Sequence, residues 1–326
     1  MNCGPVFIAG LERSGTTLLY SLIASHPNVA MTRRTNFWKF FFNRFGDLRR
    51  ADNLERCLAA MMRYRRILEL EPDWQRLREE FRQGEATYAR LFALLEEQHA
   101  RRLGKTRWGD KSLYTERYAG VVLRCFPAAK IIHIIRDPRD RYASACKANR
   151  IGRGKAAAGI AAWLWSARLA RRNAQKYPQA YHIVRFESLA CHPEETLKEV
   201  CRFIDEEYTP AMLTMNGAAD YRDKGGNSSF ERHQPGSIST APIGRFRKVL
   251  SPRDLAFVQA LARREMATFG YELEPLRFAL RERVAQRLFD WPVKLAYVAG
   301  WHVLEAYKAR AKRAPSARRL VQQPVV

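Results

Sequence analysis

The stretch VFIAGLERSGTTLLYSLIA, residues 6–24, decides the fold class that we expect for this chain. Its first four residues form a continuous apolar run, which is typical of a strand buried on both faces of a sheet. A turn containing Gly10 and Gly15 follows, and residues 18–24 have the apolar composition of a buried helix. A strand, a glycine turn and a helix in this order predict an α/β protein.

The turn GLERSGTT, residues 10–17, has the spacing of a phosphate-binding loop, in which G-x-x-x-x-G precedes two small polar residues. Glycine lets successive backbone N–H groups face inward, and the following helix adds the positive end of its dipole. The hydroxyls of Thr16 and Thr17 add two donors. A merely tight turn is the alternative, but the order of strand, turn and helix favours an anion site.

One residue that this type of loop normally carries is missing. Nucleotide hydrolases place a lysine after the second glycine, where it contacts the β- and γ-phosphates, and this chain has Thr16 there. The cation of the loop is instead Arg13, two residues before Gly15. The missing lysine disfavours a P-loop kinase or NTPase, which is the nearest alternative enzyme. We therefore expect an anion site that needs no metal ion.

The rest of the chain continues the α/β pattern around one long interruption. KIIHII (Lys130–Ile135) predicts a second buried strand, residues 156–175 a helix and residues 181–186 a third strand. Residues 36 to about 103 are helical by composition and period, and residues 216–240 have the composition of a long loop. We predict a P-loop-type three-layer α/β fold, with a mainly parallel central sheet and a helical insertion.

The C-terminal part of the chain differs in composition from the rest. We expect the main domain to cover residues 1–275 and a basic helical extension to cover residues 276–326, in which 11 Lys and Arg accompany three acidic residues. Our preferred interpretation is an amphipathic helix packed on the domain and followed by a disordered basic end. The alternative is a helix that lies on a membrane surface or holds an acidic polymer.

A second basic motif, RDPRDRYAS, begins where the strand Lys130–Ile135 ends. Arg136 is therefore expected at the sheet edge where open α/β folds bind ligands. Ser144 follows two helical turns later, so a guanidinium and a hydroxyl can converge on a terminal phosphate. Taken alone, this motif could also be a salt-bridged helix cap.

Together, the two motifs resemble the family of sulfotransferases, bacterial-type and carbohydrate-modifying ones included, that use 3′-phosphoadenosine-5′-phosphosulfate (PAPS). In that family an R/K-S-G-T-T loop cradles the 5′-phosphosulfate, and an Arg with a Ser eight positions later holds the 3′-phosphate. The resemblance implies that the donor is bound by Arg13, Ser14, Gly15, Thr16, Thr17, Arg136 and Ser144.

Three shorter segments extend the resemblance, which covers residues 5–272 and matches the helical insertion only weakly. WGDKSLY, from Trp108, is similar to the family's E-K-T-P-x-Y, and RFESL, from Arg185, to its R-Y-E-D-L. IGRFR, from Ile243, is similar to I-G-R-W-R and adds Arg245 to the implied donor site.

The resemblance implies transfer of a sulfonate group from PAPS to a hydroxyl of a lipid, saccharide or small molecule, with 3′,5′-bisphosphoadenosine as the product. Arg13 and Lys111 would stabilise the transferred group, and a hydroxyl acceptor also needs a general base. Many relatives have a Glu or His where this chain has Arg34. We expect Asp110 as the base, because it matches the acid of E-K-T-P-x-Y; an equal alternative is a carboxylate paired with Lys111 or Arg107.

The charge of the chain fits an anionic ligand without identifying it. Lys and Arg number 57 against 33 Asp and Glu, which gives a net charge of +24. A non-enzymatic protein that binds acidic polymers is therefore a further alternative, but it leaves the Arg13–Thr17 loop unexplained, and we expect no nucleic-acid partner. Six scattered cysteines and an apolar strand directly after the N-terminus predict a cytoplasmic protein, with membrane association through the basic extension as an option.

Overall fold

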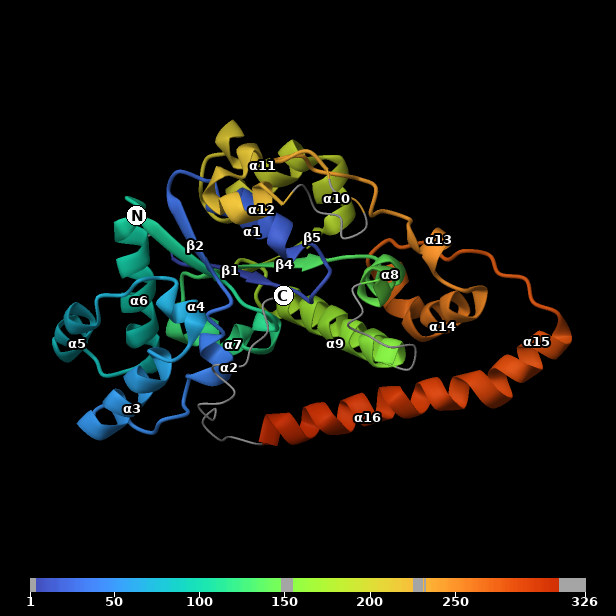
Figure 1. Ribbon diagram of the computed structural model, residues 1–326, viewed down its shortest axis with the longest axis horizontal. Helices are drawn as coiled ribbons and strands as arrows, with labels where there is room; N and C mark the ends of the chain where they lie inside the picture. Colours follow the sequence, from blue (N-terminus) through green and yellow to red (C-terminus); the bar gives the residue numbers. More distant parts are fainter. Residues whose placement is uncertain (1–3, 148–154, 225–230, 232, 311–326) are drawn as a thin grey trace.

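The computed structural model describes residues 4–147, 155–224, 231 and 233–310, and its centre is one parallel sheet (Figure 1). The strand order is β2-β3-β1-β4-β5, and every neighbouring pair is parallel. The strands are β1 (Val6–Ala9), β2 (Val29–Arg33), β3 (Arg107–Lys111), β4 (Lys130–Ile135) and β5 (Tyr181–Arg185). The predicted three-layer α/β fold with a parallel sheet is confirmed.

Helices cover both faces of the sheet. One face packs against α1 (Thr16–Ala24), α10 (Phe186–Cys191) and α11 (Pro193–Phe203), and its core includes Val6 and Ile8 of β1. The other face carries α7 (Ala119–Cys125) and α9 (Lys155–Lys176) together with the helical insertion, and its core includes Phe7 and Ala9. Alternate residues of β1 thus enter different cores, as the two-residue period of a strand requires.

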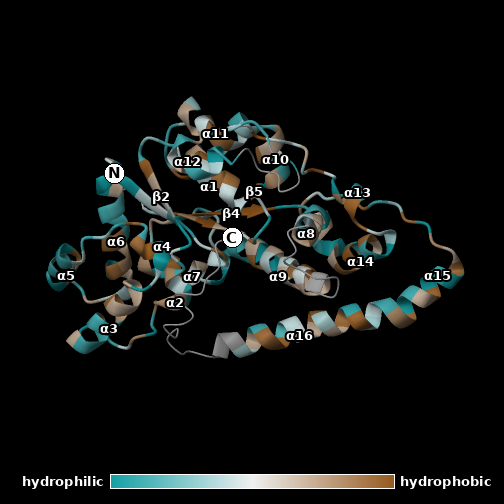
Figure 2. Cartoon of the chain, in the orientation of Figure 1, coloured by the Kyte–Doolittle hydropathy of each residue, from teal (hydrophilic) through white to brown (hydrophobic). Residues whose placement is uncertain are grey.

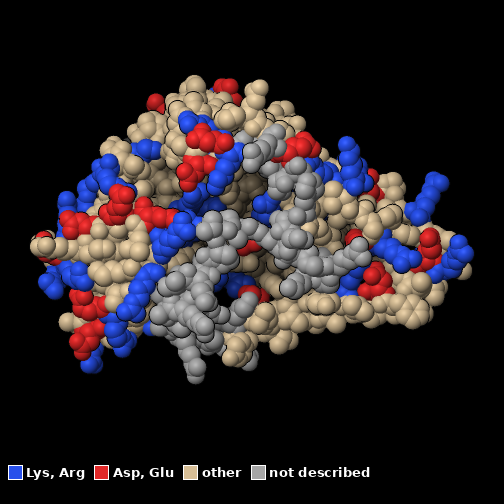
Figure 3. Space-filling model, in the orientation of Figure 1, with Lys and Arg blue, Asp and Glu red and all other residues tan. Residues whose placement is uncertain are grey.

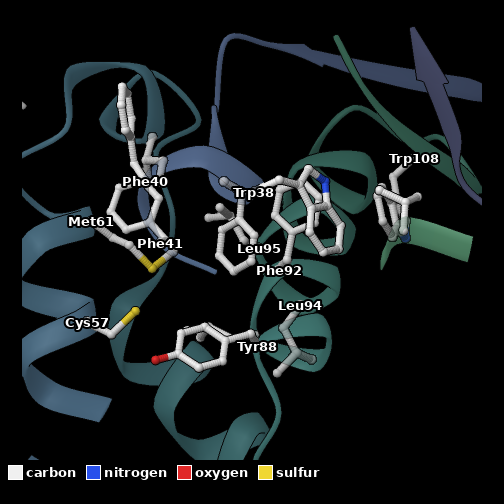
Figure 4. Packing of buried hydrophobic residues seen from close by; sticks show 14 of the residues in the cluster. Trp38, Phe40, Phe41, Cys57, Met61, Tyr88, Phe92, Leu94, Leu95 and Trp108 are labelled. Carbon is white, nitrogen blue, oxygen red and sulfur yellow. The ribbon is translucent and has the colours of Figure 1, made fainter. Parts of the chain in front are cut away.

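The predicted insertion consists of five helices that share the core of the second face. They are α2 (Phe37–Phe40), α3 (Ala51–Met61), α4 (Arg65–Leu68), α5 (Trp74–Arg82) and α6 (Tyr88–Arg102). Their aromatic side chains gather between α2, α6 and the sheet (Figure 4). The ring centroids of Phe37 and Phe92 are 4.4 Å apart, and Trp108 of β3 meets Phe92 edge to face at 5.6 Å. Aromatic side chains therefore pack the insertion against the sheet.

The sequence analysis did not predict strands β2 and β3. Their sequences, VAMTR and RWGDK, contain charged residues and a glycine, which disfavour a strand buried on both faces. All five residues of β3 are nevertheless buried, because β1 and β2 pair with it on either side and its charged side chains find partners inside the protein. The partners of Asp110 and Lys111 belong to the site described below.

The remaining described helices complete the layers and the extension. They are α8 (Pro138–Lys147), α12 (Ala219–Arg222), α13 (Phe246–Val249), α14 (Pro252–Thr268), α15 (Leu280–Ala285) and α16 (Trp291–Arg310), with 3-10 turns Thr115–Arg117, Pro210–Thr214 and Asn216–Ala218 and a π turn Gln286–Asp290. Residues 216–240 were expected as a loop, and their first seven residues instead form a 3-10 turn and α12, which pack on α1. Helix α16 lies beside α9 (Figure 1).

Candidate transfer site

The loop between β1 and α1 has a backbone that only glycine allows at two positions. Gly10 and Gly15 have φ angles of 130° and 92°. A Cβ atom on Gly10 would lie 2.5 Å from the carbonyl oxygen of Ile134, and one on Gly15 would lie 2.4 Å from Cδ2 of Phe186. Helix α1 begins at Thr16, directly after Gly15. The loop therefore presents backbone N–H groups and a helix N-terminus in the arrangement that binds anions.

A buried polar network supports the start of this loop. The N–H of Gly10 donates to Glu116 Oε2 at 3.4 Å, and the hydroxyl of Ser166 donates to Glu116 Oε1 at 2.6 Å. Ser166 also lies 3.4 Å from His133 Nε2, and His133 Nδ1 lies 2.7 Å from the hydroxyl of Tyr181. His133 is thus a buried, hydrogen-bonded residue of the core. Glu116 lies outside every motif of the sequence, so it was not among the predicted site residues.

The two predicted phosphate motifs meet at this loop. Arg13 donates from Nε to the hydroxyl of Ser144 at 2.9 Å, and Arg136 donates from Nη1 to the carbonyl oxygen of Arg13 at 3.1 Å. The guanidinium of Arg136 lies 4.6 Å from the ring centroid of Phe186, and the side chain is 5% exposed. Its Nε is buried without a hydrogen-bond partner. Residues separated by more than 120 positions thus form one cationic cluster.

The late I-G-R-F-R segment lies against the second motif. Asp140 accepts from the backbone N–H groups of Gly244 at 2.7 Å and Phe246 at 2.8 Å. Arg136 donates from Nη2 to the carbonyl oxygen of Pro242 at 2.7 Å. The side chain of Arg245 donates to Ala241 and forms an ion pair with Glu231 at 3.1 Å. The segment that contains Arg245 therefore lies beside the cationic cluster, but the guanidinium of Arg245 binds groups outside that cluster. Asp140 holds the backbone of the segment in place.

Lys111 brings a further cation to the loop. It ends β3, and its Nζ lies 3.4 Å from Oγ1 of Thr17 in the first turn of α1. The side chain is almost fully buried, and this burial together with the charges of Arg34 and Arg33 lowers the pKa of Lys111 to about 7. Such crowding of cations is unfavourable unless an anion joins them.

Asp110 lies on the other face of β3, among hydroxyl groups. Its Oδ1 accepts from Thr35 at 2.9 Å and from Thr32 at 3.1 Å, its Oδ2 is buried without a partner, and the residue is 0% exposed. Thr32 also lies 2.9 Å from Oε1 of Glu96 in α6. Burial raises the pKa of Asp110 to about 6, against the hydrogen bonds from its hydroxyl neighbours. Of the three expected catalytic residues, the structure brings Arg13 and Lys111 to the loop and places Asp110 behind the strand.

The loop carries one exposed carboxylate, that of Glu12, which the sequence analysis did not consider. Arg141 holds its backbone, donating from Nε to the carbonyl oxygen of Glu12 at 3.0 Å. The charge of Glu12 counteracts the burial that lowers the pKa of Lys111, and it adds to the burial that raises the pKa of Tyr114 to about 12. Glu12 is therefore an electrostatic neighbour of both residues. Its position inside the phosphate-loop motif was the signal that could have identified it.

The assembled groups suit an anionic ligand of the phosphate or sulfate type. Loop N–H groups, Arg13, Lys111 and the start of α1 surround one position, and Arg136 with Ser144 lie at its side. Arginine and backbone N–H groups are the donors that phosphate and sulfate groups prefer. Among the residues that the structure describes, no group of three or more His, Cys, Asp or Glu side chains could hold a metal ion.

Comparisons with known proteins identify the family of the chain and proteins with a similar fold. Residues 5–210 match the family model of the sulfotransferase family. The fold is similar to the sulfotransferase domain from the Synechococcus PCC 7002 olefin synthase, with a TM-score of 0.58 and 21% identity over 83% of this chain and 95% of that domain. It is also similar to the sulfotransferase domain from the curacin biosynthetic pathway, with a TM-score of 0.54 and 17% identity over 83% and 99%. No curated protein sequence matches significantly.

Proposed function

The chain belongs to the sulfotransferase family, and from that premise we propose that it transfers a sulfonate group from PAPS to a hydroxyl of an acceptor molecule. The observation that carries the proposal is the meeting of Arg13, Ser144 and Arg136 at the loop before α1. PAPS has two anionic ends, the 5′-phosphosulfate and the 3′-phosphate. The loop fits the first, and Arg136 with Ser144 fits the second.

Binding of PAPS would exchange contacts within the protein for contacts with the donor. The hydrogen bond from Arg13 to Ser144 would give way to bonds from both side chains to phosphate oxygens. The cations around Lys111 repel one another, and a multiply charged donor would relieve that repulsion. Arg245 would join the donor only after giving up its ion pair with Glu231, so we assign it a minor part.

The transfer step is an in-line displacement at sulfur. The acceptor oxygen forms a new bond to sulfur, the bond from sulfur to the 5′-phosphate oxygen breaks, and 3′,5′-bisphosphoadenosine leaves with the bonding electrons. Arg13, Lys111 and the loop N–H groups stabilise the charge that develops on the leaving phosphate. A bound polyanion raises the pKa of Lys111 again, since it offsets the neighbouring arginines, so Lys111 acts as a cation in this step.

Two carboxyl groups are candidates for the base that accepts the hydroxyl proton. The family resemblance suggests Asp110, but its carboxyl is enclosed by Thr32 and Thr35 on the far face of β3. Glu12 is exposed on the loop and acts electrostatically on Lys111. A base must reach the proton that it removes, so we favour Glu12 and assign Asp110 a supporting role for the turn at residues 34–36.

The acceptor is proposed as a hydroxylated lipid, saccharide or small molecule. Arg33, the last residue of β2, and Arg34, which follows it, both act electrostatically on Lys111 and would favour an acceptor that carries negative charge. Incubation with sulfur-labelled PAPS and panels of the three acceptor classes, followed by mass spectrometry of the labelled product, would identify the class.

Ligand-dependent unfolding temperature tests the donor assignment. We expect 3′,5′-bisphosphoadenosine to raise the unfolding temperature and ATP with Mg²⁺ to have no such effect, since the loop lacks the NTPase lysine. Arg13→Ala should abolish most of the shift, whereas Arg63→Ala, an exposed arginine after α3, should preserve it. Stabilisation by ATP with Mg²⁺ alone would instead support the P-loop kinase or NTPase alternative.

A further inference from the structure

In helix α16 the charged side chains face the protein, whereas those of a surface helix usually face solvent. In α16, the charged residues among positions 291–307 are Lys294 and Glu305, and both face the protein. Lys294 forms ion pairs with Asp254 at 2.9 Å and Asp290 at 2.8 Å, and Glu305 pairs with Arg117 of the turn after β3. Every acidic or basic side chain of this stretch is therefore used to attach the helix to the domain.

The opposite side of these helices is apolar and exposed. Of the 14 large hydrophobic residues that are exposed in the described chain, ten lie between positions 280 and 307. One stripe follows the spacing of a helix face and contains Phe289, Val293, Ala296, Gly300, Leu304 and Tyr307. Phe289 is 73% and Tyr307 71% exposed. Figure 3 shows this edge of the molecule as a tan band without charged side chains, and Figure 2 shows the apolar residues along α16.

Positive charge flanks the stripe on both sides in the sequence. Arg281, Arg283 and Arg287 are exposed at the α15 end, where Glu282 and Asp290 have partners at the N-terminus of α15 and on Lys294. Beyond Tyr307 the sequence contains six Lys and Arg up to position 319 and no acid to its end. An apolar face between two cationic ends matches an anionic lipid surface, which offers acyl chains under negatively charged headgroups.

The charge also argues against a second copy of the chain as the occupant. Two copies would bring together chains of +24 each, with their arginine clusters at the edges of the contact. No helix in the described residues is long and apolar enough to span a bilayer. We propose that α15 and α16 lie in the plane of an anionic membrane surface, with the stripe in the headgroup region and the domain outside it.

Vesicle binding by the full chain tests this proposal. Vesicles of phosphatidylcholine mixed with phosphatidylglycerol should sediment the protein, and vesicles of phosphatidylcholine alone should sediment less. The double variant Phe289→Glu with Leu304→Glu should bind the mixed vesicles on the order of tenfold or more weakly, because charges must enter the apolar boundary. A matched control, Leu68→Glu with Leu103→Glu, adds the same charge at exposed apolar positions of the insertion and should bind like the wild type.

Two further variants keep the test decisive. Phe289→Ser with Leu304→Ser preserves the net charge and should still weaken binding, which separates the apolar contribution from repulsion. A triple variant, Arg281→Gln with Arg283→Gln and Arg287→Gln, should bind the mixed vesicles more weakly than the wild type does. Its binding to vesicles of phosphatidylcholine alone should be unchanged. Equal binding of the stripe variants and the wild type would overturn the proposal, as would absence of wild-type binding. Sedimentation velocity showing a dimer that the stripe variants disrupt would assign the face to a second copy instead.

Discussion

Asp110 and Lys111 are neighbours in the sequence but lie on opposite faces of β3, in opposite electrostatic surroundings. On the loop face, burial of Lys111 first, and then the charges of Arg34 and Arg33, lower its pKa to about 7. On the insertion face, Asp110 shares Thr32 with the buried carboxyl of Glu96, and the pKa values of both carboxyls are raised, mainly by burial. One strand thus separates a surplus of cations from a surplus of acids.

The difference shows how each face can be neutralised. The loop face is cationic and its charge can be neutralised by a ligand, because the helix N-terminus lies there and the loop reaches solvent at Glu12, which is exposed, and at Arg13, Gly15 and Thr17, which are half-buried. The insertion face is enclosed, so burial favours the protonated form of its acids. The hydroxyl of Thr32 has one proton for Oε1 of Glu96 at 2.9 Å and Oδ1 of Asp110 at 3.1 Å, and we expect Glu96, whose pKa is raised well above its usual value, to be the protonated acid of the pair. Function is expected on the first face and structural support on the second.

The largest expected effect is on catalysis, and it is measured by replacing one acidic residue on each face with its amide. Glu12→Gln should lower kcat by about 100-fold or more, which is the usual contribution of a general base. Asp110→Asn should lower kcat by less than about tenfold, since an enclosed carboxyl does not reach the acceptor. Both values come from steady-state transfer with an identified acceptor. If Asp110→Asn caused the larger loss and left the fold intact, the base would lie on the insertion face.

Much of the fold could be predicted from the sequence, and β2 and β3 show why the rest could not. The run Val6–Ala9 is apolar throughout and the run Lys130–Ile135 is mostly apolar, so local composition was sufficient to predict both strands. Strand β3 is buried although it contains Arg107, Asp110 and Lys111. Its burial depends on partners such as Glu206, which pairs with Arg107 at 3.1 Å from 99 positions away. Such distant pairing leaves no mark in a local window.

The candidate site was predictable where a motif fixes the residue types. Spacing alone selected Arg13, Arg136 and Ser144, and the structure brings them together. The family resemblance selected Asp110 as the base, but a strand period of two directs it away from Lys111. Because β3 was not predicted as a strand, this opposite orientation could not be anticipated. In the same way, only the ion pairs of Lys294 and Glu305 show which side of α16 faces the domain.

A smaller effect on binding tests the 3′-phosphate position on the loop face. Ser144→Ala removes one hydroxyl donor to a charged phosphate, so the affinity for 3′,5′-bisphosphoadenosine should fall about tenfold. Adenosine 5′-phosphosulfate, which lacks the 3′-phosphate, should bind the variant and the wild type equally. Titration calorimetry with both ligands checks this. Equal losses for the two ligands would mean that Ser144 acts through Arg13, its hydrogen-bond partner in this structure.

The smallest expected effect on activity belongs to Glu96→Gln on the insertion face, where stability is the informative measurement. Burial first, and then the charge of Asp110, raise the pKa of Glu96 well above its usual 4.5. The native state therefore binds a proton that the unfolded state releases, and stability falls as pH rises above the unfolded pKa. As pH rises from about 5 to about 7, this group should lower the stability of the wild type by at most about 1.4 kcal/mol per pH unit.

Glutamine has nearly the same shape as glutamic acid and keeps a polar group beside the Thr32 hydroxyl without titrating, so Glu96→Gln should lack this part of the pH dependence and transfer sulfonate at nearly the wild-type rate. Urea unfolding of the two proteins across that pH range gives the difference, and Glu85→Gln, at an exposed position before α6, is the control for a lost surface charge. Parallel pH profiles of Glu96→Gln and the wild type would show that Glu96 is ionised in the native state. The insertion face would then carry a buried negative charge, and protonation would not be what distinguishes it from the loop face.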